Sequence, residues 1–188
     1  MVLALAAMQL AHAGPAPCSV WLWVSDPDPK GINVRAAPSG KSTILGQLPG
    51  GTEITAIGAK EGWIQFNNPI AFEPENGREW EPRTEGPQTG WLHGSLLKTS
   101  LRDRTKDGET DGSFALYATP DDTTGPIVRW ANRDPYSPGN DWGVVRTVLD
   151  CSTTWLKVVL ADPKDQTKTH TGWVHADNQC PSQVTTCP

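Results

Sequence analysis

Residue types suited to nucleophilic catalysis are present, since the chain holds four cysteines and four histidines. A cysteine hydrolase needs a reactive thiolate, a histidine base beside it and a polar group that orients the base. Two of the histidines, His93 and His175, stand at the same position of a repeated phrase, TGWLHGSL at residues 89–96 and TGWVHADN at residues 171–178. Equivalent placement in a repeat is typical of a scaffold residue. We therefore predict a structural role for both histidines and no catalytic residue in the chain.

Carboxylates are concentrated in one proline-rich stretch, residues 67–88, which reads NNPIAFEPENGREWEPRTEGPQ. A glycosidase holds two carboxylates about 5 to 9.5 Å apart, and a loop rich in proline is a poor rigid mount for them. The run Asp26-Pro27-Asp28-Pro29 offers only two carboxylates, whereas Ca²⁺ takes about six to eight oxygens, so we interpret it as a turn. No glycine-rich phosphate loop is present. We expect no enzyme activity, no metal and no cofactor.

The four cysteines lack the spacing of a zinc site. The closest pair, Cys180 and Cys187, has six residues between its members, whereas zinc ligands are usually separated by about two to four. Four cysteines in an exported chain predict two disulfides, for which three connectivities exist. We expect Cys151 to pair with Cys180 and close the second half of the chain. Cys18 would then pair with Cys187 and tie the chain ends together.

Charge and hydropathy exclude two classes of partner. A formal charge of −5 and a pI near 5.3 give no positive footprint for phosphates, so we expect no nucleic acid. The apolar stretch at residues 2–11 is about half the roughly 20 residues that span a bilayer, so we expect no membrane span. It is followed by Ala11-His12-Ala13, which has the A-x-A form of a signal-peptidase site. We expect residues 1–13 to be a signal peptide and the protein to be periplasmic or extracellular; a buried N-terminal helix is the alternative.

Two copies of one pattern of short strands can be read along the chain. Alternating apolar and polar residues bounded by glycine and proline are typical of half-buried strands. Such segments are, in the first copy, INVRAAPSG (32–40), TEITAIG (52–58) and EGWIQF (61–66), and in the second, FALYATPDD (114–122), GVVRTVL (143–149) and TTWLKVVL (153–160). Long helices are disfavoured by 18 glycines and 17 prolines. The pattern predicts an all-β protein.

The spacing of matched residues keeps the two copies in register. Pro38 and Pro120 are 82 residues apart, and so are Trp91 and Trp173. Differences in length between the copies belong in loops, where the entropy of closure rises only slowly with length. Residues 99–112 are polar and charge-mixed without an apolar period, so we expect a linker between the copies.

The first copy resembles the bacterial SH3-like (SH3b) domain family. The family's N-V-R-x-x-P-S opening is matched by residues 33–39 and its T-G-W-V-H closing by residues 89–93. The second copy is similar through TGWVH at residues 171–175 but lacks the opening. The resemblance implies two small SH3-like antiparallel barrels in tandem, at residues 18–98 and 113–188. It also implies a binding role beside the cell wall, and no hydrolase segment accompanies the two copies.

Aromatic residues outside the repeat are the candidates for ligand contact. The tryptophans within the repeat are expected in the core. Those outside it are Trp80 in the insertion at residues 67–88, and Trp130, Tyr136 and Trp142 in the insertion at residues 129–142. An amphipathic ring among polar loop residues suits a binding face, and it equally suits a loop anchor.

We therefore predict an exported, non-catalytic module that binds a peptidoglycan peptide or an envelope protein. The alternative is an accessory or inhibitor protein of a secreted cell-wall hydrolase or toxin.

Overall fold

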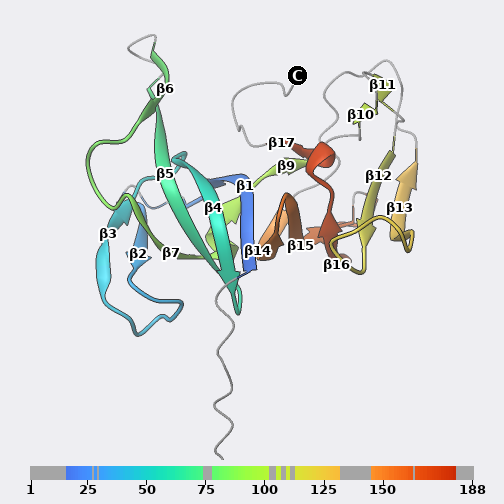
Figure 1. The fold of residues 1–188 in the computed structure, drawn as a ribbon, viewed down its shortest axis with the longest axis horizontal. Helices are drawn as coiled ribbons and strands as arrows, with labels where there is room; N and C mark the ends of the chain where they lie inside the picture. Colours follow the sequence, from blue (N-terminus) through green and yellow to red (C-terminus); the bar gives the residue numbers. More distant parts are fainter. Residues whose placement is uncertain are drawn as a thin grey trace, which may run out of the picture.

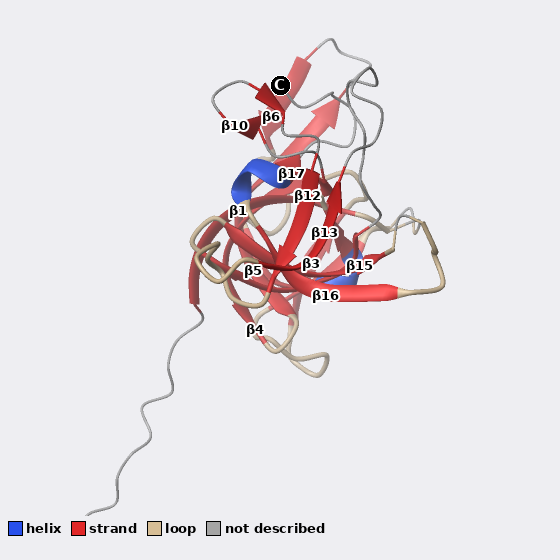
Figure 2. Ribbon diagram, turned by 90° about the vertical axis from the view of Figure 1, so that its right-hand side faces the viewer, coloured by secondary structure: helices blue, strands red, loops and turns tan. Residues whose placement is uncertain are grey.

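The structure, a computed structural model, describes residues 16–26, 28, 30–73, 78–101, 105–106, 109–110, 113–131, 145–162 and 164–180. Within these ranges the regular structure consists of antiparallel strands and two short 3-10 turns (Figure 2). The all-β prediction is confirmed. No helix in the described ranges is long and apolar enough to cross a membrane.

The first half of the chain forms an eight-stranded sheet in the order β3-β2-β7-β5-β4-β1-β8, with β6 paired to β5 (Figure 1). Its elements are β1 (Ala16–Val24), β2 (Ile32–Arg35), β3 (Ile44–Leu48), β4 (Glu53–Lys60), β5 (Trp63–Glu73), β6 (Arg78–Pro82), β7 (Thr89–His93), the 3-10 turn η2 (Gly94–Leu96) and β8 (Leu97–Lys98). The turn before β4 contains Gly51, whose φ of 81° favours glycine. The insertion at residues 67–88, expected as a loop, contains the end of β5 and all of β6, which pair as a hairpin.

The second half contains a five-stranded sheet in the order β13-β12-β16-β15-β14. Its elements are β12 (Ser113–Tyr117), β13 (Pro126–Ala131), β14 (Val145–Ser152), β15 (Trp155–Ala161), β16 (Thr169–Val174) and the 3-10 turn η3 (Ala176–Asn178). Two small two-stranded ladders accompany it: β9 (Ser100–Leu101) pairs with β17 (Gln179–Cys180), and β10 (Thr105–Lys106) pairs with β11 (Glu109–Thr110). The segment expected as a linker therefore contributes strands.

The two sheets share one strand order. The order β13-β12-β16-β15-β14 repeats β3-β2-β7-β5-β4 strand for strand. The register agrees as well, because Arg35 pairs with Trp91 in the first sheet and Tyr117 pairs with Trp173 in the second. The short closing strands are also equivalent, since β8 pairs with β1 as β17 pairs with β9. This correspondence supports the interpretation that one plan is used twice.

One hydrophobic core nevertheless runs through both halves. Leu22 and Phe66 from the first sheet belong to the same buried cluster as Phe114 and Leu156 from the second. Strand β1 lies between the two sheets, beside β4 and β14 (Figure 1). Backbone hydrogen bonds of 2.6 Å, from Ser19 N to Thr153 O, and of 2.9 Å, from Thr153 N to Pro17 O, join it to the second half. Each half therefore completes the interior of the other.

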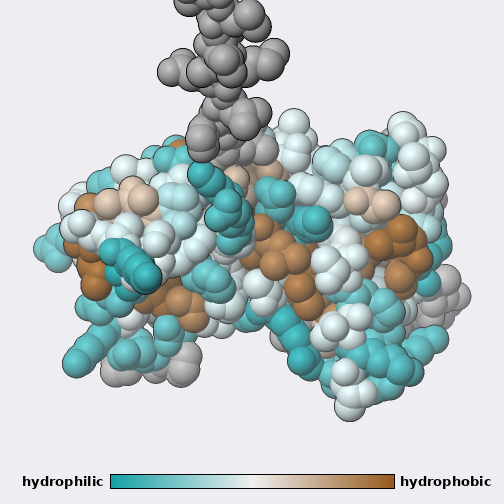
Figure 3. All heavy atoms as spheres, turned by 90° about the horizontal axis from the view of Figure 1, so that it is seen from below, coloured by the Kyte–Doolittle hydropathy of each residue, from teal (hydrophilic) through white to brown (hydrophobic). Residues whose placement is uncertain are grey.

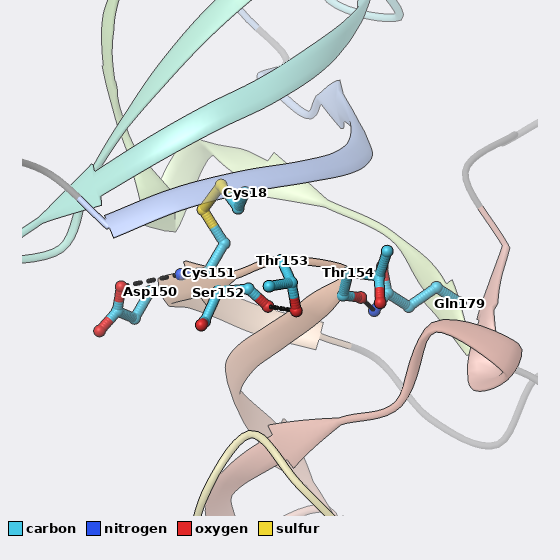
Figure 4. The surroundings of a disulfide bond; sticks show 7 residues. All are labelled: Cys18, Asp150, Cys151, Ser152, Thr153, Thr154 and Gln179. Atoms are coloured by element: carbon cyan, nitrogen blue, oxygen red, sulfur yellow. Dashed lines mark hydrogen bonds between the residues drawn. A yellow bond between two sulfur atoms is a disulfide. The ribbon is translucent and has the colours of Figure 1, made fainter.

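A disulfide joins the two halves at this junction. Cys18 of β1 is bonded to Cys151 of β14, with a Cα–Cα distance of 5.6 Å and a sequence separation of 133 (Figure 4). The predicted pairing of Cys151 with Cys180, and of Cys18 with Cys187, is wrong because the path of β1 carries Cys18 to the end of β14. Cys180 lies in β17, where it pairs through its backbone with Ser100, and Cys187 lies outside the described residues.

Candidate functional site

The repeated T-G-W phrase meets a packing requirement in each sheet. A Cβ on Gly172 would lie 2.8 Å from Leu116 Cβ and 3.0 Å from Tyr117 O. A Cβ on Gly90 would collide with Val34 Cγ1 at the equivalent place. Because the neighbouring strand passes so close, only glycine fits. The phrase occurs twice because each sheet has the same crossing.

The histidines of the phrase cap the turns that follow it. The backbone amide of Asp177 donates to His175 Nδ1 at 3.1 Å, and the amide of Ser95 donates to His93 Nδ1 at 3.4 Å. Each ring also lies edge-on to a tryptophan, His93 at 5.2 Å from Trp63 and His175 at 4.7 Å from Trp155. These contacts are those of a scaffold. Cys151 is buried and disulfide-bonded, so it offers no thiolate to either histidine.

Of the four aromatic residues predicted to bind ligand, the structure describes the side chain of Trp130 alone. Trp130 lies in β13, is only 8% exposed and stacks on Phe114 at 5.5 Å. For this residue the structure favours the anchoring role. Trp80 lies in β6, but its side chain is outside the described part, and Tyr136 and Trp142 lie outside the described residues altogether.

An exposed tryptophan stands instead on β1. Trp21 is 55% exposed. It pairs with Thr55 of β4, which pairs in turn with Asn67 of β5. In the next row Trp23 pairs with Glu53, and Glu53 pairs with Ile70.

These two rows lie on the outer face of the first sheet. The alternate residues of β1 and β4, among them Leu22 and Ile54, belong to the core cluster, and side chains alternate between the faces of a strand. We call this surface the Trp21 face, and its members are Trp21, Trp23, Glu53, Thr55 and Asn67.

Glu53 is the unusual member of the Trp21 face. It is only 6% exposed, and its Oε1 atom has no hydrogen-bond partner within the described part of the chain. Trp23 and Ile70 flank it in register on the adjacent strands. Burial raises the pKa of this carboxyl from 4.5 to about 7, because the charged form loses its hydration. Among the residues whose side chains are described, no ion pair to Glu53 is found.

Asn67 presents a second unpartnered oxygen. Its Oδ1 atom is buried and has no hydrogen-bond partner in the described structure. A bulge follows it in β5, where the register shifts between the Thr55–Asn67 and Glu53–Ile70 pairs and Asn68 takes a left-handed φ of 48°. Glu53 and Asn67 therefore occupy successive rows of the same face on neighbouring strands. A buried acceptor without a partner costs about 1 to 3 kcal/mol, so two of them together call for a donor.

The second sheet has valines at the positions equivalent to Glu53 and Asn67. Thr147 pairs with Val159 as Thr55 pairs with Asn67, so Val159 stands where the first sheet has Asn67. Two residues before Thr147, where the first sheet has Glu53, stands Val145, which is buried. The second sheet thus shows what the same scaffold does when these positions serve packing alone.

Other exposed apolar side chains lie on edge strands. Ile44 and Leu45 of β3 are 49% and 51% exposed, and Ile127 of β13 is 52% exposed. Strands β3 and β13 end the two sheets. On the face drawn in Figure 3, apolar residues form separate patches in a largely polar surface. An open strand edge can accept an extended peptide through its backbone.

Sequence reasoning missed the Trp21 face because Trp21 and Trp23 precede the repeat frame. A signal was present, since tryptophans two residues apart on a strand must share a face. The burial of Glu53 had no such signal, because TEIT reads as an ordinary alternation with the acid toward water.

A comparison with known protein families gives a match in the first half of the chain. Residues 30–98 match the family model described as a bacterial SH3 domain. This match confirms the resemblance of the first copy; it covers β2 to β8 but neither β1 nor the second sheet. No curated protein matches the chain. A bacterial SH3 domain indicates a binding module, commonly one for the cell wall.

Proposed function

We propose that the protein is an exported, non-catalytic binding module that recognises a cell-wall peptide through the Trp21 face. The SH3 match supports a binding role, and the disulfide between Cys18 and Cys151 is consistent with an oxidising compartment outside the cytoplasm. The observation that carries the site is Trp21, an indole 55% exposed beside two unpartnered polar side chains.

Tryptophan is a favoured anchor in binding sites because it covers a large area with little loss of side-chain entropy. Trp21 pairs with Thr55 of β4, and further along β1 the backbone of Pro17 and Ser19 is hydrogen-bonded to Thr153 of the second half. A preformed anchor of this kind reduces the cost of ordering on binding. An extended wall peptide lying across β1 and β4 would cover the indole and reach the polar rows beside it.

The experiment is a pull-down on purified sacculi, run beside one on a periplasmic extract. Wild type should be retained on sacculi, and Trp21→Ala should reduce the retained fraction about tenfold or more, as expected for an anchor residue. Ile127→Ala is the matched control, because Ile127 is 52% exposed on the second sheet and should bind like wild type. Undiminished wall binding by Trp21→Ala would rule out the site.

A protein partner is the second candidate, and the open edge of β3 favours it. Ile44 and Leu45 lie at a β-bulge, where the register shifts between the Val34–Gly46 and Arg35–Ile44 pairs, and both are about half exposed. Such an edge could position an envelope protein or a secreted hydrolase by strand addition. Capture of one protein from the extract that is lost in Leu45→Lys, with no retention on sacculi, would support this function instead. In either case we expect no turnover of muropeptides.

A further inference from the structure

We propose that Glu53 and Asn67 form a subsite of the Trp21 face for a primary ammonium group carried by the bound peptide. The inference rests on the proposed function for the location of the ligand. It goes further by naming the chemical group that the ligand must present. Glu53 Oε1 and Asn67 Oδ1 are the two acceptors, and the indoles of Trp21 and Trp23 stand beside them on β1.

The charge balance of this region favours a cation. Glu53 is only 6% exposed, and its Oε1 atom has no hydrogen-bond partner among the described residues. The described cationic side chains that lie nearest to Glu53 along the paired strands form no ion pair with it. Lys98, across from Trp23, donates to the Arg146 carbonyl at 2.7 Å. Arg83 follows β6 and has an unpartnered Nε of its own, but no ion pair between it and Glu53 is found. A cationic group on a ligand would supply a partner for this carboxylate.

The arrangement suits a compact donor better than a planar one. An ammonium carries three donors on one nitrogen and can meet single oxygens from two strands, whereas a guanidinium prefers both oxygens of one carboxylate. The indole faces of Trp21 and Trp23 would add cation–π attraction.

The second sheet gives an internal comparison. With Val145 and Val159 at the matching positions, and Ser100 where β1 has Trp23, it has neither the acceptors nor the indole. The polar pair is therefore not a requirement of the scaffold. Its presence in the first sheet alone, at an uncompensated cost of burial, indicates a role in binding.

The test is a titration of ¹⁵N-labelled protein at pH 8, with the indole N–H of Trp21 as reporter. The probe is Nα-acetyl-L-lysine methylamide, and its matched partner is the Nα,Nε-diacetyl compound, which lacks only the ammonium. We expect the first to shift the Trp21 signal and the second to bind about tenfold or more weakly, as loss of a hydrogen-bonded charge implies. Glu53→Gln should weaken the first probe to the level of the second. Glu61→Gln, an exposed acid in the turn at the far end of β4, should not.

The outcomes distinguish a failure of the ammonium subsite from a failure of the proposed binding through the Trp21 face. A third probe, Nα-acetyl-L-arginine methylamide, is titrated in the same way. Equal binding of the two lysine probes, unchanged affinity in Glu53→Gln, or tighter binding of the arginine probe would overturn the ammonium subsite. The retained fraction on sacculi gives a second readout. If Trp21→Ala lowers it but neither Glu53→Gln nor prior N-acetylation of the wall does, the Trp21 face binds the wall and the ammonium subsite is wrong. Full retention of Trp21→Ala would reject the face itself.

Discussion

Replacement of both Cys18 and Cys151 by alanine is expected to lower the free energy of unfolding by about 2 to 5 kcal/mol. The bond spans 133 residues of sequence. In the chain-entropy description, closing a loop of this length removes from the unfolded state an entropy equivalent to about 5 kcal/mol at 25 °C. Engineered and natural bridges often contribute less than this limit, which sets the lower end of the range.

Urea unfolding followed by tryptophan fluorescence measures the effect. With an m-value of about 2 kcal/mol per molar, the midpoint should fall by about 1 to 2.5 M. Because one core connects the sheets, a single transition is expected in both proteins. A reductant should bring both proteins to one midpoint, with the larger fall in wild type, because in the double variant only a bond between Cys180 and Cys187 is left to reduce. A difference that persists after reduction would measure the packing of the sulfur atoms.

Tryptic mapping without reduction tests whether Cys18 is bonded to Cys151. Cleavage after Lys30, Arg146, Lys157 and Lys168 puts Cys18, Cys151 and the pair Cys180 and Cys187 on three different peptides. The peptide 147–157 should be linked to the one that ends at Lys30, which leaves Cys180 and Cys187 to pair within residues 169–188. A link from 147–157 to 169–188 would contradict the pairing of Cys18 with Cys151, and an unchanged urea midpoint in the double variant would contradict its contribution to stability.

Three further expectations concern stability. Since the pKa of Glu53 is raised from 4.5 to about 7, the folded state binds the extra proton and loses stability as pH rises through that window. In urea titrations the free energy of unfolding of Glu53→Gln should exceed that of wild type by about 1 to 3 kcal/mol at pH 8 and should equal it near pH 4. Gly172→Ala should destabilise by about 1 to 3 kcal/mol because its Cβ meets Leu116, whereas Gly40→Ala, with nothing within 4 Å, should change the thermal midpoint little. A fragment of residues 30–98 alone should be unfolded by circular dichroism, because it lacks β1 and the second half of the core; a folded fragment would contradict the shared core.

The local elements could be read from the residues. The alternation after Pro49-Gly50-Gly51 predicted the strand that became β4, and TTWLKVVL predicted β15, because turn residues and a period of two act within a few positions. The structural role of His93 and His175 followed from their equal placement in the repeat. In the structure each of these histidines caps a 3-10 turn and makes an edge-on contact with a tryptophan.

The tertiary structure decided the features that depend on contacts between distant segments. Cys18 finds Cys151 because β1 runs along both sheets, and no spacing in the chain encodes that path. Trp130 packs on Phe114 in the core, although it stands between Arg129 and the mostly polar segment that follows Ala131. Glu53 has the sequence of a solvent-facing strand residue, yet Trp23 and Ile70 bury it from two sides. Burial is a property of the partners that packing supplies, and so the most distinctive chemistry of this protein appears only when the strands are assembled.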